Sequence, residues 1–175
     1  LPPPEKVAHF KNRRTDTIYE TQRAHVIINP FSGRKKGNEV GDFVSKELAD
    51  AKIEVKRYKT DAPEHAISIV HELSLAPNDI IVSVGGDGTL CETITGLMLR
   101  PDSAYESIPM ALIPAGSGNS QANDMEIIDY MNAVERILNG RLRKIDIGKV
   151  TFMSDDKQDI RYSHNLVGWG LGVDS

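Results

Sequence analysis

Short apolar runs alternate with longer amphipathic segments along the first 144 residues of the chain. The runs are rich in Val and Ile and are bounded by turn residues, which is typical of strands buried in a parallel sheet. We expect strands at residues 23–29, 53–58, 80–84 and 109–114. After each run, apolar residues recur three and four positions apart, which is the spacing of a buried helix face. The predicted helices cover residues 38–51, 63–74, 90–99 and 120–138, with Pro63 at a first helical position and Asp61 ahead of it as a cap.

Four strand–helix repeats predict an α/β fold, in which a parallel sheet lies between two layers of helices. From about residue 145 the pattern changes to two consecutive strands, at residues 145–152 and 160–167, around a polar hairpin. Residues 1–22 are polar and begin with a Pro-rich stretch, so they are expected to form a linker with a short strand around residues 16–20.

The expected domains are therefore an α/β domain at residues 23–144 and the truncated beginning of an antiparallel domain at residues 145–175. The chain begins with Leu1 rather than Met, and Ser175 falls inside what looks like an unfinished strand, so we expect a fragment of a longer protein.

Composition narrows the class of protein. The net charge of −4 over 175 residues argues against general nucleic-acid binding. A single cysteine, Cys91, excludes an internal disulfide framework and fits a reducing compartment. No apolar run approaches the roughly 20 residues that cross a bilayer, so a cytoplasmic location is expected. The sequence does not indicate an oligomeric state.

A glycine-rich turn follows the most apolar strand. Residues 80–84 run into Gly85, Gly86, Asp87, Gly88 and Thr89, and a predicted helix follows. Unpaired N–H groups and the helix dipole at such a turn suit an anion, most often phosphate. The carboxylate of Asp87 is unusual in an anion site unless it binds a metal or takes a proton from an attacking hydroxyl. The alternative is a tight strand–helix connection with Asp87 as a simple cap.

Two more small-residue turns follow other strands. NPFSG, at residues 29–33, precedes the cations Arg34, Lys35 and Lys36, and AGSGN occupies residues 115–119. Each feature has a plain alternative, because NPFSG is a good turn and a run of cations is usually solvated. However, the carboxyl ends of parallel strands line one crevice, so the three turns are expected to meet at one ligand site. They match neither the dinucleotide fingerprint nor the Walker loop.

NPFSG, VSVGGDGTLCETITGL and PAGSGN, in this order, resemble the catalytic domain of the diacylglycerol kinase and sphingosine kinase superfamily. The resemblance covers residues 23–174, and PAGSGN and WGLGVD look most like the sphingosine kinase branch. It implies a nucleotide-binding domain like that of NAD kinases and phosphofructokinases, followed by a β-sandwich lipid-binding domain. It also implies ATP, Mg²⁺ and transfer of the γ-phosphate to a lipid hydroxyl, with a sphingoid base ahead of diacylglycerol or ceramide. The lipid acceptor implies peripheral association with a membrane surface.

The resemblance assigns roles to residues. Asp87 would be the catalytic base, and Asp174 would hold the lipid head group unless it is only a turn residue. No residue is assigned as a metal ligand. The implied nucleotide contacts are Asn29, Ser32, Gly33, Thr60, Gly85, Gly86, Gly88, Thr89, Gly116 and Ser117. The segment at residues 120–132 is short for the family, which puts a helix at residues 121–124 in doubt. An NAD kinase-like enzyme and an inactive nucleotide-binding domain are the alternatives.

Overall fold

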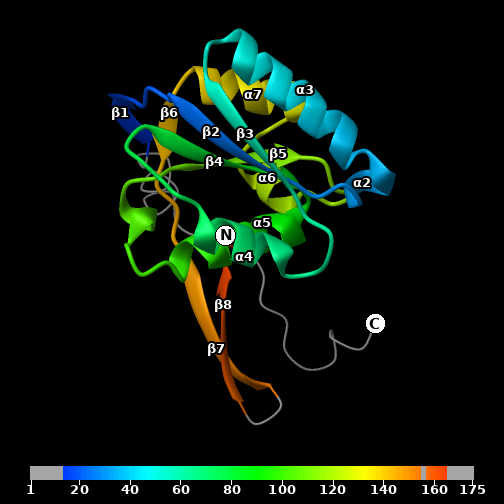
Figure 1. Ribbon diagram of the computed structural model, residues 1–175, viewed down its shortest axis with the longest axis vertical. Coiled ribbons are helices and arrows are strands. Elements are labelled where there is room, and N and C mark those ends of the chain that lie inside the picture. Colours follow the sequence, from blue (N-terminus) through cyan, green and yellow to red (C-terminus); the bar gives the residue numbers. More distant parts are fainter. Residues whose placement is uncertain (1–13, 155–156, 165–175) are drawn as a thin grey trace, which may run out of the picture.

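A four-stranded parallel sheet forms the centre of the computed structural model, which describes residues 14–154 and 157–164 (Figure 1). Its strand order is β3-β2-β4-β5. The strands are β2 (Arg23–Ile28), β3 (Glu54–Lys59), β4 (Asp79–Gly85) and β5 (Met110–Pro114). The register aligns Ile28 with both Lys59 and Val84, and Gly85 with Pro114. The carboxyl ends of all four strands therefore lie level at one edge of the sheet.

Helices cover both faces of this sheet, which confirms the predicted α/β fold (Figure 1). On one face lie α3 (Gly37–Asp50) and α7 (Tyr130–Leu138), and on the other lie α4 (His65–Glu72) and α5 (Asp87–Met98). Alternate strand residues supply the two cores, because successive side chains point to opposite faces. Val82 packs in the core with Val44 and Val134, whereas Ile81 packs with Val70 and Leu97. The remaining short helical segments are α2 (Ser32–Lys35), η1 (Ala104–Glu106) and α6 (Ser120–Asp124).

Two predicted helices differ from those observed. The single helix expected at residues 120–138 is two helices, α6 and α7, separated by a turn in which Glu126 has a φ of 58°. Asp129 caps the second helix, because its carboxylate accepts a hydrogen bond of 2.8 Å from the Asn132 N–H. The helix expected from Pro63 begins at His65, after Glu64 in a left-handed conformation, so the predicted Asp61 cap is wrong.

Four further strands lie outside the central sheet. β1 (Arg14–Ile18) pairs antiparallel with β6 (Arg141–Arg143), a strand that the basic composition of that segment did not predict. β7 (Gly148–Ser154) and β8 (Lys157–Ser163) form an antiparallel hairpin that extends away from the layer of α4 and α5 (Figure 1). Two consecutive strands without an intervening helix were predicted here. That residues 145–175 begin a separate domain stays a prediction, because residues 165–175 lie outside the described part of the chain.

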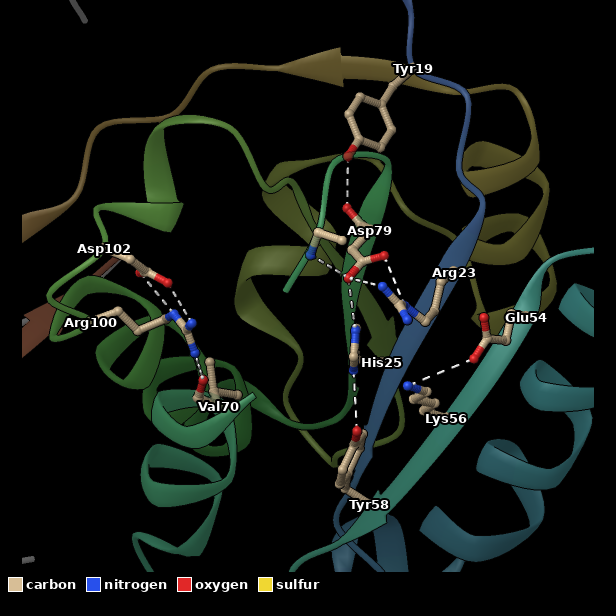
Figure 2. A network of polar contacts seen from close by, with 11 residues as sticks. Tyr19, Arg23, His25, Glu54, Lys56, Tyr58, Val70, Asp79, Arg100 and Asp102 are labelled. Carbon is tan, nitrogen blue, oxygen red and sulfur yellow. Dashed lines mark hydrogen bonds and ion pairs between the residues drawn. The ribbon is translucent and has the colours of Figure 1, made fainter. Parts of the chain in front are cut away.

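A buried polar network joins the amino ends of β2 and β4 and extends to Tyr58 in β3 (Figure 2). The carboxylate of Asp79 accepts hydrogen bonds of 2.9 and 3.1 Å from Arg23 and lies 3.1 Å from Nε2 of His25. Nδ1 of His25 lies 3.2 Å from the Tyr58 hydroxyl. Burial lowers the pKa of His25 more than the Asp79 carboxylate raises it, so the ring stays neutral at pH 7. This network stabilises the sheet at the edge opposite the glycine turns.

Candidate active site

The three glycine turns meet backbone to backbone at the carboxyl edge of the sheet. A Cβ atom added to Gly33 would stand 2.2 Å from the carbonyl oxygen of Ala115, and one added to Gly116 would stand 2.5 Å from Cα of Gly86. Contacts below 3.0 Å leave no room for a side chain, so these glycines let the loops after β2, β4 and β5 touch. The predicted convergence of the turns at one rim is confirmed.

Asn29 joins the first turn to the second. Its side-chain nitrogen Nδ2 donates a hydrogen bond of 3.0 Å to the hydroxyl of buried Thr89. Its backbone carbonyl oxygen accepts one of 2.8 Å from the Ser32 hydroxyl. Beyond Ser32, Gly33, Arg34 and Lys35 all have positive φ, between 54° and 70°. Two non-glycine residues in this region store backbone strain, which is common in segments that bind ligands. The cations of this loop are exposed at the rim.

Asp87 is the first residue of α5, and its carboxylate reaches across to the third turn. One oxygen accepts a hydrogen bond of 2.9 Å from the Ser120 N–H, and the other accepts one of 3.1 Å from the Gln121 N–H. Burial raises the pKa of Asp87, but these backbone N–H groups and the nearby His164 outweigh burial and hold the pKa below its usual range. The carboxylate is therefore ionised and fixed in position at neutral pH.

Gly88 differs from the other glycines of the site. Outside its own stretch of α5, a Cβ atom added to Gly88 would meet no atom of the described residues within 4 Å, whereas one added to Gly85 would stand 2.5 Å from the Thr89 side chain. Gly85 is thus required by the fold of its own turn. The space beside Gly88, at the start of α5, is open to a ligand.

The third turn is closed by its own asparagine. Oδ1 of Asn119 accepts a hydrogen bond of 2.9 Å from the Gly116 N–H, and Nδ2 donates one of 2.9 Å to the Gly116 carbonyl. Ser117 is exposed at the tip of the turn. Thr60 is buried directly after β3, where its N–H bonds to the carbonyl of Ile28 at 2.9 Å.

All ten predicted nucleotide-contact residues and Asp87 therefore lie at or directly after the carboxyl ends of the four strands, whereas Asp174 lies outside the described residues. Sequence reasoning missed three residues near this edge. Asn119 braces the third turn, and the GSGN pattern carried that signal. Asn38, at the start of α3, and His164, after β8, have buried polar atoms without a hydrogen-bond partner among the described residues. Neither showed a signal in the sequence pattern.

The described residues do not provide a metal cage of their own. Within residues 14–154 and 157–164, no three His, Cys, Asp or Glu side chains gather closely enough to hold a metal ion. Each carboxylate oxygen of Asp87 already accepts a backbone N–H. In the same part of the chain, no helix is long and apolar enough to cross a membrane.

Glycine turns, exposed cations and one fixed carboxylate lie together at the carboxyl edge of a parallel sheet, an arrangement typical of domains that bind phosphate groups. The sequence model of the diacylglycerol kinase catalytic domain matches residues 23–150. The chain belongs to this diacylglycerol kinase catalytic domain family, as the three motifs predicted.

The relatives include proteins named sphingosine kinase and proteins named diacylglycerol kinase. The chain is 37% identical to sphingosine kinase B of Dictyostelium discoideum over 73% of its own length and 17% of the relative's. It is 31% identical to sphingosine kinase 1 of Arabidopsis thaliana, covering 85% of this chain and 31% of that protein. It is 32% identical to diacylglycerol kinase of Bacillus subtilis, covering 74% of this chain and 42% of that protein. The chain thus spans less than half the length of these three relatives.

A diacylglycerol kinase of Bacillus anthracis has the same fold. Its crystal structure superposes with a TM-score of 0.54 at 20% identity, over 78% of this chain and 47% of that one. At this identity the likeness concerns the fold alone.

Proposed function

We propose that the chain is the nucleotide-binding catalytic domain of a lipid kinase that transfers the γ-phosphate of ATP to the hydroxyl of a sphingoid base. The observation that carries the proposal is the meeting of three glycine turns around one ionised aspartate at a helix N-terminus. The motifs PAGSGN and WGLGVD favour the sphingoid base over diacylglycerol or ceramide. The relatives named for sphingosine and for diacylglycerol support either lipid as acceptor.

The triphosphate would lie along the rim formed by the three turns. Backbone N–H groups at Gly86 to Thr89, at the start of α5, would neutralise phosphate oxygens, assisted by the helix dipole. Arg34 and Lys36 are exposed at the same rim and would add positive charge. Mg²⁺ would arrive with the nucleotide phosphates, because the described residues offer no cage for it. When bound, the ion neutralises charge on the transferred phosphoryl group.

Asp87 would take the proton of the lipid hydroxyl. As the oxygen–hydrogen bond breaks, the proton moves to a carboxylate oxygen, the hydroxyl oxygen bonds to the γ-phosphorus, and the bond from that phosphorus to the bridging oxygen of ADP breaks. The hydrogen bonds from Ser120 and Gln121 occupy one lone pair of each Asp87 oxygen and leave another for the hydroxyl. Positioned proton transfer of this kind contributes about 10²–10⁴-fold to rate.

The lipid itself would be held by residues that follow the nucleotide domain. The proposed β-sandwich would begin with the β7–β8 hairpin, and Asp174 would bind the polar head of the acceptor. Because the acceptor is a lipid, we expect peripheral contact with a membrane surface in the cytoplasm.

The test is a transfer assay on the polypeptide as its gene encodes it. Labelled ATP is offered with sphingosine, dioleoylglycerol, ceramide or NAD, each in a separate reaction. We expect sphingosine to be phosphorylated fastest and NAD not at all. Asp87→Asn should abolish transfer and keep ATP affinity, while Asp50→Asn, at the exposed end of α3, should match the wild type. Full turnover by Asp87→Asn would show that the base is a different group.

A further inference from the structure

His164 is a half-buried histidine at the end of the described part of the chain. Both ring nitrogens are shielded from solvent, and neither has a hydrogen-bond partner in the part of the chain that the structure describes. Leaving a buried polar group unpaired is unfavourable, which is why most such groups in proteins are paired. A ligand that hydrogen-bonds to such a group removes this unfavourable contribution.

β8 carries His164 toward the start of α5. Two contacts hold the strand against that helix: the Cys91 thiol donates to the carbonyl of Tyr162 at 3.2 Å, and the Tyr162 N–H donates to the Thr95 hydroxyl at 3.3 Å. Cys91 lies about one helical turn after Asp87, and His164 follows Tyr162 by two residues. Asp87 and His164 are near enough for each charge to act on the pKa of the other group.

The imidazole is neutral at neutral pH. Burial lowers the pKa of His164, and the Asp87 carboxylate opposes this effect without cancelling it. A neutral imidazole has one nitrogen that donates and one that accepts a hydrogen bond. The Asp87 carboxylate can only accept hydrogen bonds. The His164 imidazole can donate one to the oxygen of an alcohol.

We propose that His164 belongs to the acceptor subsite and donates a hydrogen bond to the oxygen of the lipid hydroxyl that Asp87 deprotonates. This inference rests on the proposed kinase function. The hydroxyl donates its proton to Asp87 and accepts from the His164 N–H. After the proton has moved to Asp87, the same N–H stabilises the oxygen while it bonds to the γ-phosphorus and ADP leaves. His164 thereby fixes the hydroxyl between carboxylate and phosphate.

The substitutions His164→Leu and His164→Phe remove the donor and keep an apolar side chain in the buried space. We expect kcat/KM for the acceptor to fall about 10- to 100-fold, the effect of losing one oriented hydrogen bond. The KM for ATP should stay unchanged, and thermal stability should not fall because an unpaired polar group has been removed. His164→Asn keeps a donor and should regain part of the lost kcat/KM. His71→Leu, at an exposed histidine of α4, is the matched control and should behave as the wild type.

The measurements use the polypeptide as its gene encodes it, with sphingosine and dioleoylglycerol in mixed micelles. Equilibrium binding of each lipid is measured in the presence of ADP, alongside turnover. An unchanged kcat/KM in a folded leucine or phenylalanine variant would overturn the assignment, as would an equal loss of ATP affinity. If the wild-type protein binds lipid without phosphorylating it, the kinase proposal is wrong. Weaker lipid binding in the His164 variants would still support the placement of His164 in the lipid subsite. If the wild type binds neither lipid, both proposals are wrong.

Discussion

The substitution Gly88→Ala tests whether Gly88 is needed for ligand binding rather than for folding. Outside its own stretch of helix, the added Cβ would meet no atom within 4 Å in residues 14–154 and 157–164. Gly88 lies in the first turn of α5, where alanine is at least as favourable as glycine. We therefore expect stability to be unchanged or to rise by up to about 1 kcal/mol, which is about 2–4 °C in Tm for a chain of this size.

The same methyl group stands where a phosphate oxygen would approach the N–H groups at the start of α5. A charge-assisted hydrogen bond lost there is equivalent to about 1.5–3 kcal/mol, so the Kd for ATP should rise about 10- to 100-fold. Isothermal titration calorimetry gives the Kd, and differential scanning calorimetry gives Tm on the same samples.

Gly96→Ala is the reciprocal control on the same helix. Its Cβ would stand 2.6 Å from the carbonyl oxygen of Ile67 and 3.0 Å from Cβ of Val70, so Tm should fall while the folded protein keeps its ATP affinity. If Gly88→Ala binds ATP as tightly as the wild type, the space beside Gly88 does not hold phosphate.

Three further predictions concern the two edges of the sheet. Asp79→Asn leaves Arg23 without its buried carboxylate, so the free energy of unfolding in urea should fall by about 3 kcal/mol with no change in the Kd for ATP. The pKa of His25 is lower in the folded protein than its usual value of about 6.5. The unfolded chain therefore binds a proton more readily, and the free energy of unfolding should fall as pH drops below about 6.5. Urea unfolding at pH 7.5 and pH 5.5 measures this fall. Asn119→Ala removes both bonds that close the Gly116 turn and should cost about 1–2 kcal/mol while weakening ATP binding, whereas an unchanged Kd would show that this turn does not contact the nucleotide.

Local sequence patterns predicted the central sheet and the glycine turns at its carboxyl edge, because both depend on residues that are close together in the sequence. The run from Ile80 to Val84 is buried along its whole length, and the glycines after it form the turn that the pattern indicated. The convergence of the turns followed from strand direction alone, since parallel strands end at one edge.

Other features depend on contacts between distant residues. The break between α6 and α7 comes from a left-handed Glu126 and the Asp129 cap inside an otherwise periodic segment. β6 forms because β1 pairs with it across more than a hundred residues of chain. His164 comes near α5 only because β8 packs on that helix through Tyr162. A single-sequence pattern does not encode such pairings.

In the proposed kinase domain, three separate turns hold one triphosphate near Asp87. The most direct measurement is a titration of the ¹⁵N-labelled protein with a non-hydrolysable ATP analogue, followed by the backbone amide resonances. The amide resonances of Gly33, Gly88 and Ser117 should all shift and follow one binding curve. Shifts confined to a single turn, or separate binding curves for different turns, would contradict this arrangement.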